Sequence, residues 1–495
     1  MAPPNILLLF SDQHRGDWLP FSDTQFEALG MEPLDLKMEH IRELMKNGTV
    51  FTNAVTTSPL CVPARACLAS GLQYHNCGIW NNDFCFPIKD QTFYKVLKNG
   101  GYQVAGVGKF DLHKPILYWN KDGWLDQLAE LGFTDAIDSE GKYDLLWSSF
   151  YESKGPYSNF LRENGLFDVH AKDYMLRYFD TCDADETPLP EYAYADNWVT
   201  SNAKDMMNQL MKQSDPWFMM VNFSGPHNPW DITKEMKEEC KDLNFPPPRG
   251  CSGDLERINQ VRQNYSAMIE NIDKNIGSLV SMLKETGQYE NTVIIYSSDH
   301  GEMLGDKGRF FKSVPYRGAV RIPMIISGAG VVKDRICANK VQLHDLASTI
   351  LDFAEMKFPV ETDSISLKPL AQGRTDEDIR DYQIIMLHNS VRHEGSYEDY
   401  KDYMIHQKKG TDFDYIEEFN KKYHLPIKDS VKKYDYNKDW ECIISENYKL
   451  VMFADETFEL YDLKNDPFEL ENIASDAQDV VERLKNKYQN ITSKP

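Results

Sequence analysis

The first strand-like stretch of the chain reads Asn5-Ile-Leu-Leu-Leu-Phe-Ser-Asp-Gln-His14. A short apolar run that ends in polar, turn-forming residues is typical of a buried strand. The stretch Thr292-Val-Ile-Ile-Tyr-Ser-Ser-Asp-His300 repeats this design much later in the chain. Both stretches therefore predict strands of a sheet that carry acids and an imidazole just beyond their carboxyl ends.

Strand and helix patterns alternate along most of the chain. The strongest helix signal covers residues 255–285, where apolar residues recur every three or four positions. Two more helices are expected at 38–45 and 343–353, and further strands at 49–54, 102–107, 217–223 and 324–327. This alternation predicts an α/β fold with a mixed, mostly parallel sheet flanked by helices.

The character of the sequence changes after about Gly373. Residues 376–439 are charged and rich in tyrosine, and they precede two predicted strands at 448–453 and 458–463 and a closing helix at 477–489. We therefore predict a catalytic domain over residues 1–375 and a smaller α+β subdomain over residues 376–495. Residues 120–194 are polar and aromatic, and we interpret them as insertions that shape a pocket.

Composition excludes several classes of protein. The chain has 495 residues, of which 41% are hydrophobic and 26% charged, as in an ordinary globular protein. Its 54 basic and 77 acidic side chains give a net charge of −23, which argues against a nucleic-acid or anionic-membrane partner. The longest apolar stretches, 6–10 and 217–221, fall far short of the roughly 18–20 residues that cross a bilayer.

Two further features concern the cellular compartment. Apolar residues begin at Asn5 with no basic leader and no small-residue cleavage site, so a cytoplasmic location is expected unless a leader has been removed. The nine cysteines, an odd number without repeat spacing, fit reduced thiols better than a disulfide framework.

Reactive side chains follow the predicted strands. The set comprises acids, imidazoles, an amide, a lysine and a cysteine, namely Asp12, Gln13, Cys61, Lys109, His113, His227, Asp299 and His300. Because the carboxyl ends of parallel strands meet at one edge of a sheet, these groups are expected in one site. That combination suits a metal-assisted hydrolase.

The candidate metal ligands are Asp12, Gln13, Asp299 and His300. Two carboxylates with an amide oxygen and an imidazole favour a hard divalent cation, Ca²⁺ before Mg²⁺ or Mn²⁺. Each Ser-Asp pair taken alone would suit a loop start or a helix cap. The presence of two such pairs, each directly after an apolar strand, favours the metal.

Cys61 stands at the start of Cys61-Val-Pro-Ala-Arg65, at a predicted helix N-terminus where anions are stabilised. Most cysteines are small buried apolar residues rather than nucleophiles. A zinc site among Cys61, Cys67, Cys77 and Cys85 is disfavoured, because these cysteines lack the close spacing of zinc ligands. The position of Cys61, with Arg65 one turn along, makes it the candidate nucleophile.

The segment Ser58-Pro-Leu-Cys-Val-Pro-Ala-Arg-Ala-Cys-Leu-Ala-Ser-Gly71 resembles the signature of type I sulfatases. The resemblance extends, in the family's order, over Asn5–Gln13, Gly106–Lys109, Pro226–Pro229, Ser298–Asp306 with Lys312, Arg321–Pro323 and Glu459–Pro467. It implies an alkaline-phosphatase-like α/β fold with a smaller C-terminal subdomain. It also implies hydrolysis of a sulfate ester with release of inorganic sulfate.

The resemblance implies a role for each site residue. Cys61 would be oxidised by a maturation enzyme to Cα-formylglycine, whose hydrate attacks sulfur and also binds the metal. Arg65, Lys109 and Lys312 would offset negative charge, and His227 would protonate the departing alkoxide. His113 would remove a proton in the second step. Contacts to substrate are implied for Asn82, Lys109, His227 and Lys312.

The third-strand motif departs from the commonest family pattern. Many relatives have Lys-x-His, whereas this chain has Lys109-Phe-Asp-Leu-His113, so the second-step role falls to either Asp111 or His113. The Asp299-His300 pair also occurs in phosphonate monoester hydrolases of the same superfamily, which makes a phosphonate or phosphate ester hydrolase the rival. Lys109 argues against that rival. A silent binder of sulfated glycans would have lost a metal or nucleophile position, and none is missing.

The sequence gives only indirect indications of the substrate. The acidic surface favours a small sulfated sugar, such as a mono- or disaccharide, over a long polyanion. His388, Arg392 and His393 could reach the pocket from the C-terminal subdomain, although a surface role is favoured. Trp80, Trp119 and Trp230 could stack on a sugar, but a core position is favoured for them too.

Overall fold

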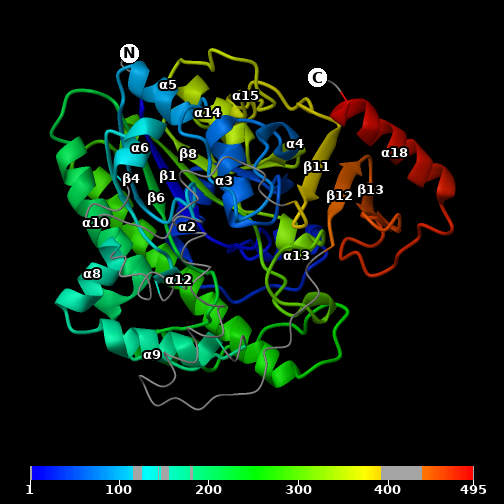
Figure 1. Cartoon of the computed structure of the whole chain (residues 1–495), viewed down its shortest axis with the longest axis horizontal. Coiled ribbons are helices and arrows are strands. Elements are labelled where there is room, and N and C mark those ends of the chain that lie inside the picture. Colours follow the sequence, from blue (N-terminus) through cyan, green and yellow to red (C-terminus); the bar gives the residue numbers. More distant parts are fainter. Residues whose placement is uncertain are drawn as a thin grey trace.

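The computed structural model describes residues 3–114, 125–142, 144–145, 155–178, 182–391 and 438–493. An eight-stranded sheet forms its centre, with the strand order β5-β4-β6-β1-β7-β8-β2-β9 (Figure 1). The strands are β1 (Asn5–Ser11), β2 (Gly48–Phe51), β4 (Gln103–Gly108), β5 (Asp135–Asp138), β6 (Trp217–Asn222), β7 (Thr292–Ser298), β8 (Met324–Gly328) and β9 (Arg335–Cys337). β1 lies at the centre and pairs in parallel with β6 and β7.

The sheet is mixed and mostly parallel, as predicted. β8 runs antiparallel to both of its neighbours, β7 and β2, while the other pairings in this sheet are parallel. Parallel strands buried on both faces are apolar throughout, and every residue of β1, β6 and β7 is buried. The carboxyl ends of β1, β6 and β7 therefore lie side by side at one edge.

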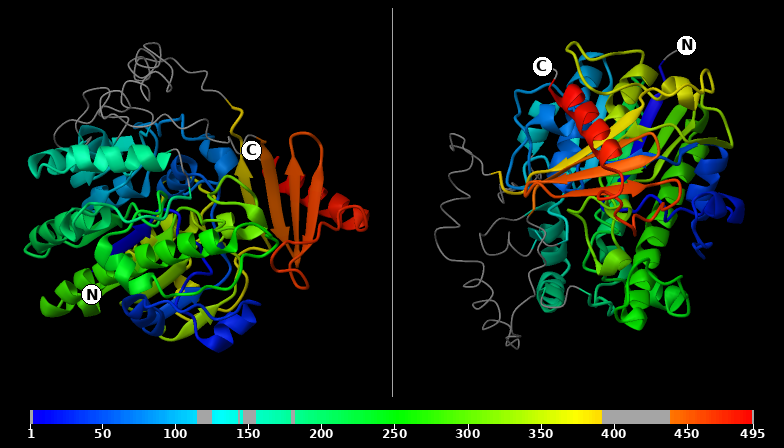
Figure 2. Two further views of the ribbon diagram at one scale, coloured as in Figure 1. Left: turned by 90° about the horizontal axis from the view of Figure 1, so that it is seen from below. Right: turned by 90° about the vertical axis from the view of Figure 1, so that its right-hand side faces the viewer.

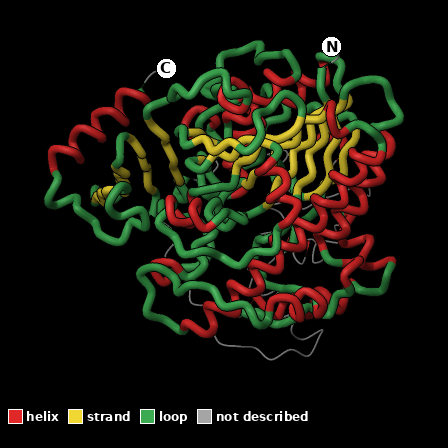
Figure 3. The backbone as a smooth tube through the Cα atoms, turned by 180° about the vertical axis from the view of Figure 1, so that it is seen from behind, coloured by secondary structure: helices red, strands yellow, loops and turns green. Residues whose placement is uncertain are grey.

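Helices cover both faces of the sheet, which lies between them in Figure 3. The helices of the described residues are α1 (Asp23–Ala28), α2 (Glu39–Lys46), α3 (Cys61–Ser70), α4 (Tyr74–Cys77), α5 (Phe93–Asn99), α6 (Leu125–Leu131), α8 (Pro156–Glu163), α9 (Phe167–Tyr178), α10 (Ala195–Leu210), α11 (Lys234–Cys240), α12 (Leu255–Glu285), α13 (Arg317–Val320), α14 (Asp345–Phe353), α15 (Lys368–Ala371) and α18 (Gln478–Thr492). Of these, α18 packs on the C-terminal sheet and not on the main sheet. The helix predicted over residues 255–285 is confirmed with the same bounds.

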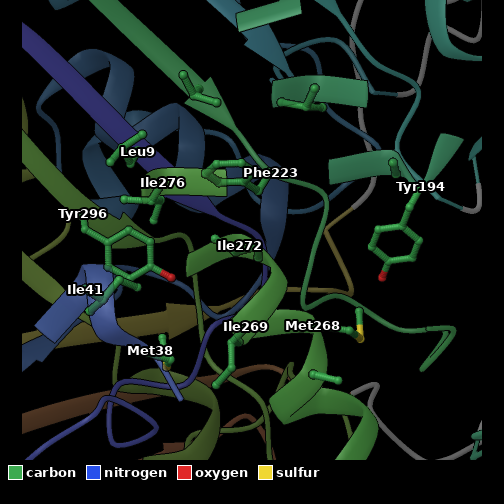
Figure 4. Packing of buried hydrophobic residues seen from close by; sticks show 14 of the residues in the cluster. Leu9, Met38, Ile41, Tyr194, Phe223, Met268, Ile269, Ile272, Ile276 and Tyr296 are labelled. Atoms are coloured by element: carbon green, nitrogen blue, oxygen red, sulfur yellow. The ribbon is translucent and has the colours of Figure 1, made fainter. Parts of the chain in front are cut away.

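Side chains of β1 alternate between two hydrophobic cores. Leu7 and Leu9 pack with the core that contains α12, and Figure 4 shows Leu9 near Ile272 and Ile276 of that helix. Ile6, Leu8 and Phe10 pack in the other core, with α3, α5 and α14. This period of two is the geometry of a strand. Helix α3, which begins at Cys61, thus lies on the face opposite α12.

The C-terminal sheet is larger than predicted. Four antiparallel strands form it in the order β11-β12-β13-β14, and α18 packs on it (Figure 2). β13 (Tyr448–Phe453) and β14 (Phe458–Asp462) confirm the predicted pair, but β11 (Tyr382–Leu387) and β12 (Trp440–Ser445) were missing from the prediction. The charged surroundings of these two segments hide short apolar cores. The division at residue 376 remains a prediction.

Two other sequence interpretations were wrong in part. The stretch 120–194 is not purely an insertion, because β5 within it pairs with β4 at the edge of the main sheet. Residues 49–54 were predicted as one strand but divide into β2 in the main sheet and β3 (Ala54–Val55), which pairs with β10 (Val341–Gln342). The residues between β2 and β3 form a turn, which ends the first strand. Over the described ranges, no helix has both the length and the apolarity to cross a membrane.

His170 of α9 gives a testable pH dependence of stability. Neither ring nitrogen has a hydrogen-bond partner in the part of the chain that the structure describes, and the ring packs against Tyr174 at a centroid distance of 4.0 Å. Burial lowers its pKa from 6.5 to about 4. Between these values the unfolded chain binds a proton that the folded chain does not, so stability falls as the pH falls from about 6.5 to about 4.

We expect His170→Phe, which keeps an aromatic ring but cannot ionise, to remove this term. The variant should be more stable than the parent by roughly 2 kcal/mol near pH 4.5 and close to it near pH 7. Chemical denaturation at the two pH values measures the difference. An equal difference at both values would show that packing, and not ionisation, separates the two proteins.

Candidate active site

Four potential metal ligands meet at the carboxyl edge of the main sheet. Asp12 directly follows β1, Asp299 and His300 directly follow β7, and Cys61 begins α3. One ligand atom from each of the four residues lies within 4.8 Å of the others, and all four side chains are buried. The structure thus brings together groups that are up to 288 residues apart (300 − 12 = 288) in the sequence.

The donor set fits a hard divalent cation. Asp12 Oδ1 is buried, has no hydrogen-bond partner among the described residues and lies 3.9 Å from His300 Nε2. A carboxylate oxygen in a dry site is costly unless a charge or donor compensates it. His300 Nε2 also lies 3.4 Å from Cys61 Sγ. Carboxylate oxygens with an imidazole are suitable ligands for calcium, magnesium or manganese.

The Gln13 side chain contacts the ammonium group of Lys312 and the carboxylate of Glu302. Its Oε1 accepts a hydrogen bond from Lys312 Nζ at 2.6 Å, and its Nε2 donates to Glu302 Oε2 at 2.6 Å. Gln13 also has a positive φ of 73°, a conformation that non-glycine residues rarely adopt. Its backbone N–H donates to Asp299 Oδ1 at 3.0 Å, which ties the loops after β1 and β7 together.

Two buried cations balance the acids. Arg65 donates from Nε to Asp299 Oδ2 at 2.9 Å, and its Nη2 lies 3.5 Å from Asp12 Oδ2. Lys109 forms a close ion pair with Asp12. Burial would lower the pKa of Lys109, but Asp111 and Asp12 outweigh it and raise the pKa well above its usual value. Both cations therefore stay charged, and they lower the pKa of Asp12 below its usual value.

Cys61 is the first residue of α3, directly after the extended Leu60. The neighbouring Val62 N–H donates to Asn82 Oδ1 at 3.1 Å, so Asn82 caps the helix beside the thiol. Burial and Asp12 act to raise the pKa of the Cys61 thiol, but Lys109, Lys312 and His300 lower it below its usual value. The positive end of the helix adds to these charges. Position 61 is therefore suited to an anionic group.

His227 and Lys312 lie on the other side of the site. Lys312 Nζ contacts His227 Nε2, and the His227 Nδ1 is close to the backbone oxygen of Asn228. Burial and the Lys312 charge lower the pKa of His227 well below its usual value. The imidazole is therefore neutral next to a charged ammonium, which is the arrangement of a pair that can pass on one proton.

The structure joins Asp111 to the Cys61 thiol through Lys109. Asp111 Oδ2 lies 3.1 Å from Lys109 Nζ, and Lys109 Nζ lies 3.9 Å from Cys61 Sγ. Asp111 is buried and has a positive φ of 53°. His113 is also buried, and burial lowers its pKa to about 4 against a hydrogen bond with the backbone of Phe86.

Three contributors to the site were not predicted. Asn222 is the last residue of β6, and its Oδ1 accepts from Arg65 Nη1 at 3.3 Å; inspection of strand ends alone would have found it. Glu302 anchors Gln13, and burial raises its pKa to about 7. Glu302 belongs to the motif 298–306, but the sequence did not indicate its role.

Lys114 pairs with Asp111 at 3.1 Å and with Asp144 at 2.9 Å, and no sequence pattern pointed to it.

The aromatic and C-terminal residues considered for substrate contacts fall into three groups. Trp230 is fully buried, as favoured from the sequence. Trp80 is half-buried and stacks on His388, with centroids 5.5 Å apart, and His388 Nε2 lies 3.1 Å from Glu441 Oε1. Trp119, Arg392 and His393 lie outside the described residues.

Comparison with known proteins gives a consistent set of relatives. A family model described as Sulfatase matches residues 4–356. The chain is 27% identical over 410 residues to an arylsulfatase of Clostridium perfringens, with 77% of this chain and 80% of that protein covered. It is 25% identical over 525 residues to an N-acetylglucosamine-6-O-sulfatase of Bacteroides thetaiotaomicron, with 96% and 83% covered.

Solved structures show the same fold. A phosphonate monoester hydrolase of Agrobacterium radiobacter superposes with a TM-score of 0.71 at 21% identity, covering 99% of this chain and 95% of that one. A protein solved in complex with its substrate D-glucosamine-2-N,6-O-disulfate superposes with a TM-score of 0.69 at 20% identity, covering 99% and 98%. The predicted alkaline-phosphatase-like fold is thus confirmed. Since the family model also spans more than half of the sequence, the chain belongs to the sulfatase family and is a sulfuric ester hydrolase.

Proposed function

We propose that the protein removes sulfate from a small sulfated sugar, with Cys61 oxidised to Cα-formylglycine by a maturation enzyme. Asp12, Gln13, residue 61, Asp299 and His300 would hold the cation, Ca²⁺ before Mg²⁺ or Mn²⁺. When present, the cation polarises a sulfuryl oxygen and the hydrated aldehyde supplies the attacking oxygen. The convergence of Asp12, Cys61, Asp299 and His300 within 4.8 Å is the observation that carries this proposal.

The cations of the site bind and orient the sulfate group. Lys109 lies 3.9 Å from Cys61 Sγ, and Lys312 lies beside Gln13 and His227, so the two ammonium groups approach position 61 from two sides. Fixed positive charges in a water-poor site stabilise charge that develops on sulfuryl oxygens. Arg65 pairs with Asp12 and Asp299 and holds their carboxylates in place.

Two protons move in the reaction. His227 and Lys312 share one at the Nε2–Nζ contact, and this proton passes to the leaving-group oxygen as the ester bond breaks. The second proton leaves the hydroxyl of residue 61 as sulfate departs. We assign the acceptance of this proton to Asp111, which is joined to the site through Lys109, and not to His113.

A pair of substitutions tests this assignment. We expect Asp111→Asn to lower kcat by about 10²- to 10³-fold, because an amide cannot accept the proton. The alcohol product should then appear in a burst faster than sulfate does. His113→Gln, the matched control, should change kcat by less than about tenfold. A burst in the His113 variant with none in the Asp111 variant would reverse the assignment.

The sugar substrate is supported by two relatives. One is named an N-acetylglucosamine-6-O-sulfatase, and one structural neighbour was solved with D-glucosamine-2-N,6-O-disulfate. The net charge of −23 disfavours a long polyanion. We expect the highest kcat/KM for a sulfated mono- or disaccharide in a panel that also contains an aryl sulfate, choline sulfate, an intact sulfated polymer and an aryl phosphonate.

The same panel separates the rival functions. Faster turnover of the phosphonate would favour a phosphonate hydrolase, and faster turnover of the polymer would contradict the small substrate. Mass spectrometry of the Cys61 peptide, after co-expression with a maturation enzyme, tests the oxidation directly. A thiol that persists there, together with binding of sulfated glycans and no sulfate release, would favour a silent binder.

A further inference from the structure

A cavity of about 360 Å³ lies between the main sheet and the C-terminal sheet. The turn between β2 and β3, the residue after α13, and the turns that follow β12 and β14 line it. None of the residues proposed for catalysis or metal binding contributes to its wall. It is therefore a separate site from the one that contains Cys61.

Positive charge accumulates in this cavity. Arg321, Lys340 and Lys464 line it, and within the described part of the chain none of them forms an ion pair with a carboxylate. The two glutamates of the wall are already engaged. Glu469 pairs with Lys449 at 2.7 Å, and Glu446 pairs with Arg483 at 2.9 Å. The cavity wall thus has three cations that form no direct ion pair with a described carboxylate, although Asp17 and Glu469 lie close enough to act on Arg321, in a chain whose net charge is −23.

Arg321 is the central group. Its Nη2 donates to the backbone oxygen of Thr52 and, at 3.4 Å, to Asn53 Oδ1, while Nε and Nη1 have no partner among the described residues. Burial, and then the nearby Arg317, lower its pKa to about 9. A guanidinium that is held by neutral oxygens in a positive field favours the entry of an anion, and its two free donor groups suit an oxyanion.

We propose that this cavity binds a small oxyanion against Arg321, with Lys340 and Lys464 beside it. Inorganic sulfate, inorganic phosphate and the sulfate group of a sugar share the required chemistry. The anion would lie next to the catalytic loop, because the Arg321 backbone oxygen accepts a hydrogen bond from Gly16 N at 3.0 Å. Gly16 closes the loop that begins at Asp12, and its α-carbon is so close to Ile322 that a side chain would clash with the backbone.

The direct test is crystallographic. Crystals of the whole protein soaked in selenate, an anomalously scattering analogue of sulfate, should show a peak at the Arg321 guanidinium. A parallel soak in a monosaccharide sulfate distinguishes the two sources, because sugar density continuous with the oxyanion would identify a sulfated sugar as the ligand. Selenate density confined to the Cys61 site would overturn the proposal.

Calorimetric titration with phosphate tests it in solution. Lys340→Gln/Lys464→Gln should weaken binding at the cavity by about 100-fold, since each of the two lost charged contacts contributes about 1.5 kcal/mol, or about tenfold. Lys37→Gln/Lys212→Gln, which removes the same charge from two exposed lysines elsewhere, is the control. Equal weakening in both double variants would show a general charge effect and contradict the site.

Arg321→Gln should abolish binding at the cavity. If Arg321→Gln does not fold, Lys340→Gln/Lys464→Gln still tests the proposal. Sulfate release measured without added phosphate should be unchanged in Lys340→Gln/Lys464→Gln. The outcome at the cavity is thus independent of whether the proposed sugar sulfatase activity is found.

Discussion

Cys61→Ser lowers sulfate release by about 10⁴-fold or more, which is the largest effect on activity that we expect. Serine keeps an oxygen at the start of α3 but offers only one hydroxyl group. The hydrated aldehyde offers two, so that one can attack sulfur while the other releases the product. The variant should still bind substrate, because Lys109, Lys312 and His227 are unchanged.

A second cysteine on the same helix supplies the control. Cys67 is also fully buried but packs toward the C-terminal sheet, in the cluster that contains Tyr74 and Leu460. Cys67→Ala should retain sulfate release within about tenfold. Release of sulfate and alcohol from the preferred sugar sulfate, measured at saturating substrate, gives the comparison. Substantial activity in Cys61→Ser would remove the basis for a formylglycine at position 61.

Arg65→Leu has the largest expected effect on stability. The guanidinium touches the carboxylates of Asp299 and Asp12, and both of these acids are completely buried. Removal of one partner from a buried ion pair typically costs about 3–5 kcal/mol, because a charge remains without compensation. We expect a loss of this size in metal-free buffer, together with a loss of activity.

Added calcium should restore part of the stability of Arg65→Leu, because a cation that binds the folded state compensates Asp12 and Asp299. Arg65→Lys is the control: it retains the charge but not the planar fork that reaches both acids, and it should be destabilised less than the leucine variant. Chemical denaturation with and without calcium measures both effects. Equal stability of Arg65→Leu in the two buffers would argue against a cation at these carboxylates.

Several elements of the fold were predictable because their signals are local. The apolar run of β1, the three-to-four-residue periodicity of α12 and the polar residues directly after β1 and β7 can each be read within a short window. The shift of composition near Gly373 also indicated a second substructure. β11 and β12 escaped prediction because they lie next to strongly charged segments, so that a window average conceals them.

The candidate site was predictable as a set of residues but not as a set of contacts. Strand ends identified Asp12, Asp299 and His300, since the carboxyl edge of a parallel sheet brings such groups together whatever lies between them. The partners of these groups depend on side-chain directions that no local pattern encodes. Asn82 is an example, because its amide caps α3 across a span of 20 residues.

By itself, the sequence determined which residues are candidates for the chemistry and which segments form the central strands β1, β6 and β7, because residue type and periodicity are properties of neighbouring positions. Only the tertiary structure decided that Asp111 adjoins Lys109 and that Glu302 anchors Gln13. It also decided that Arg321 faces a cavity in which it forms no ion pair with a carboxylate of the described residues. These outcomes depend on the packing of segments far apart in the chain, where a few ångströms separate an ion pair from an unrelated side chain.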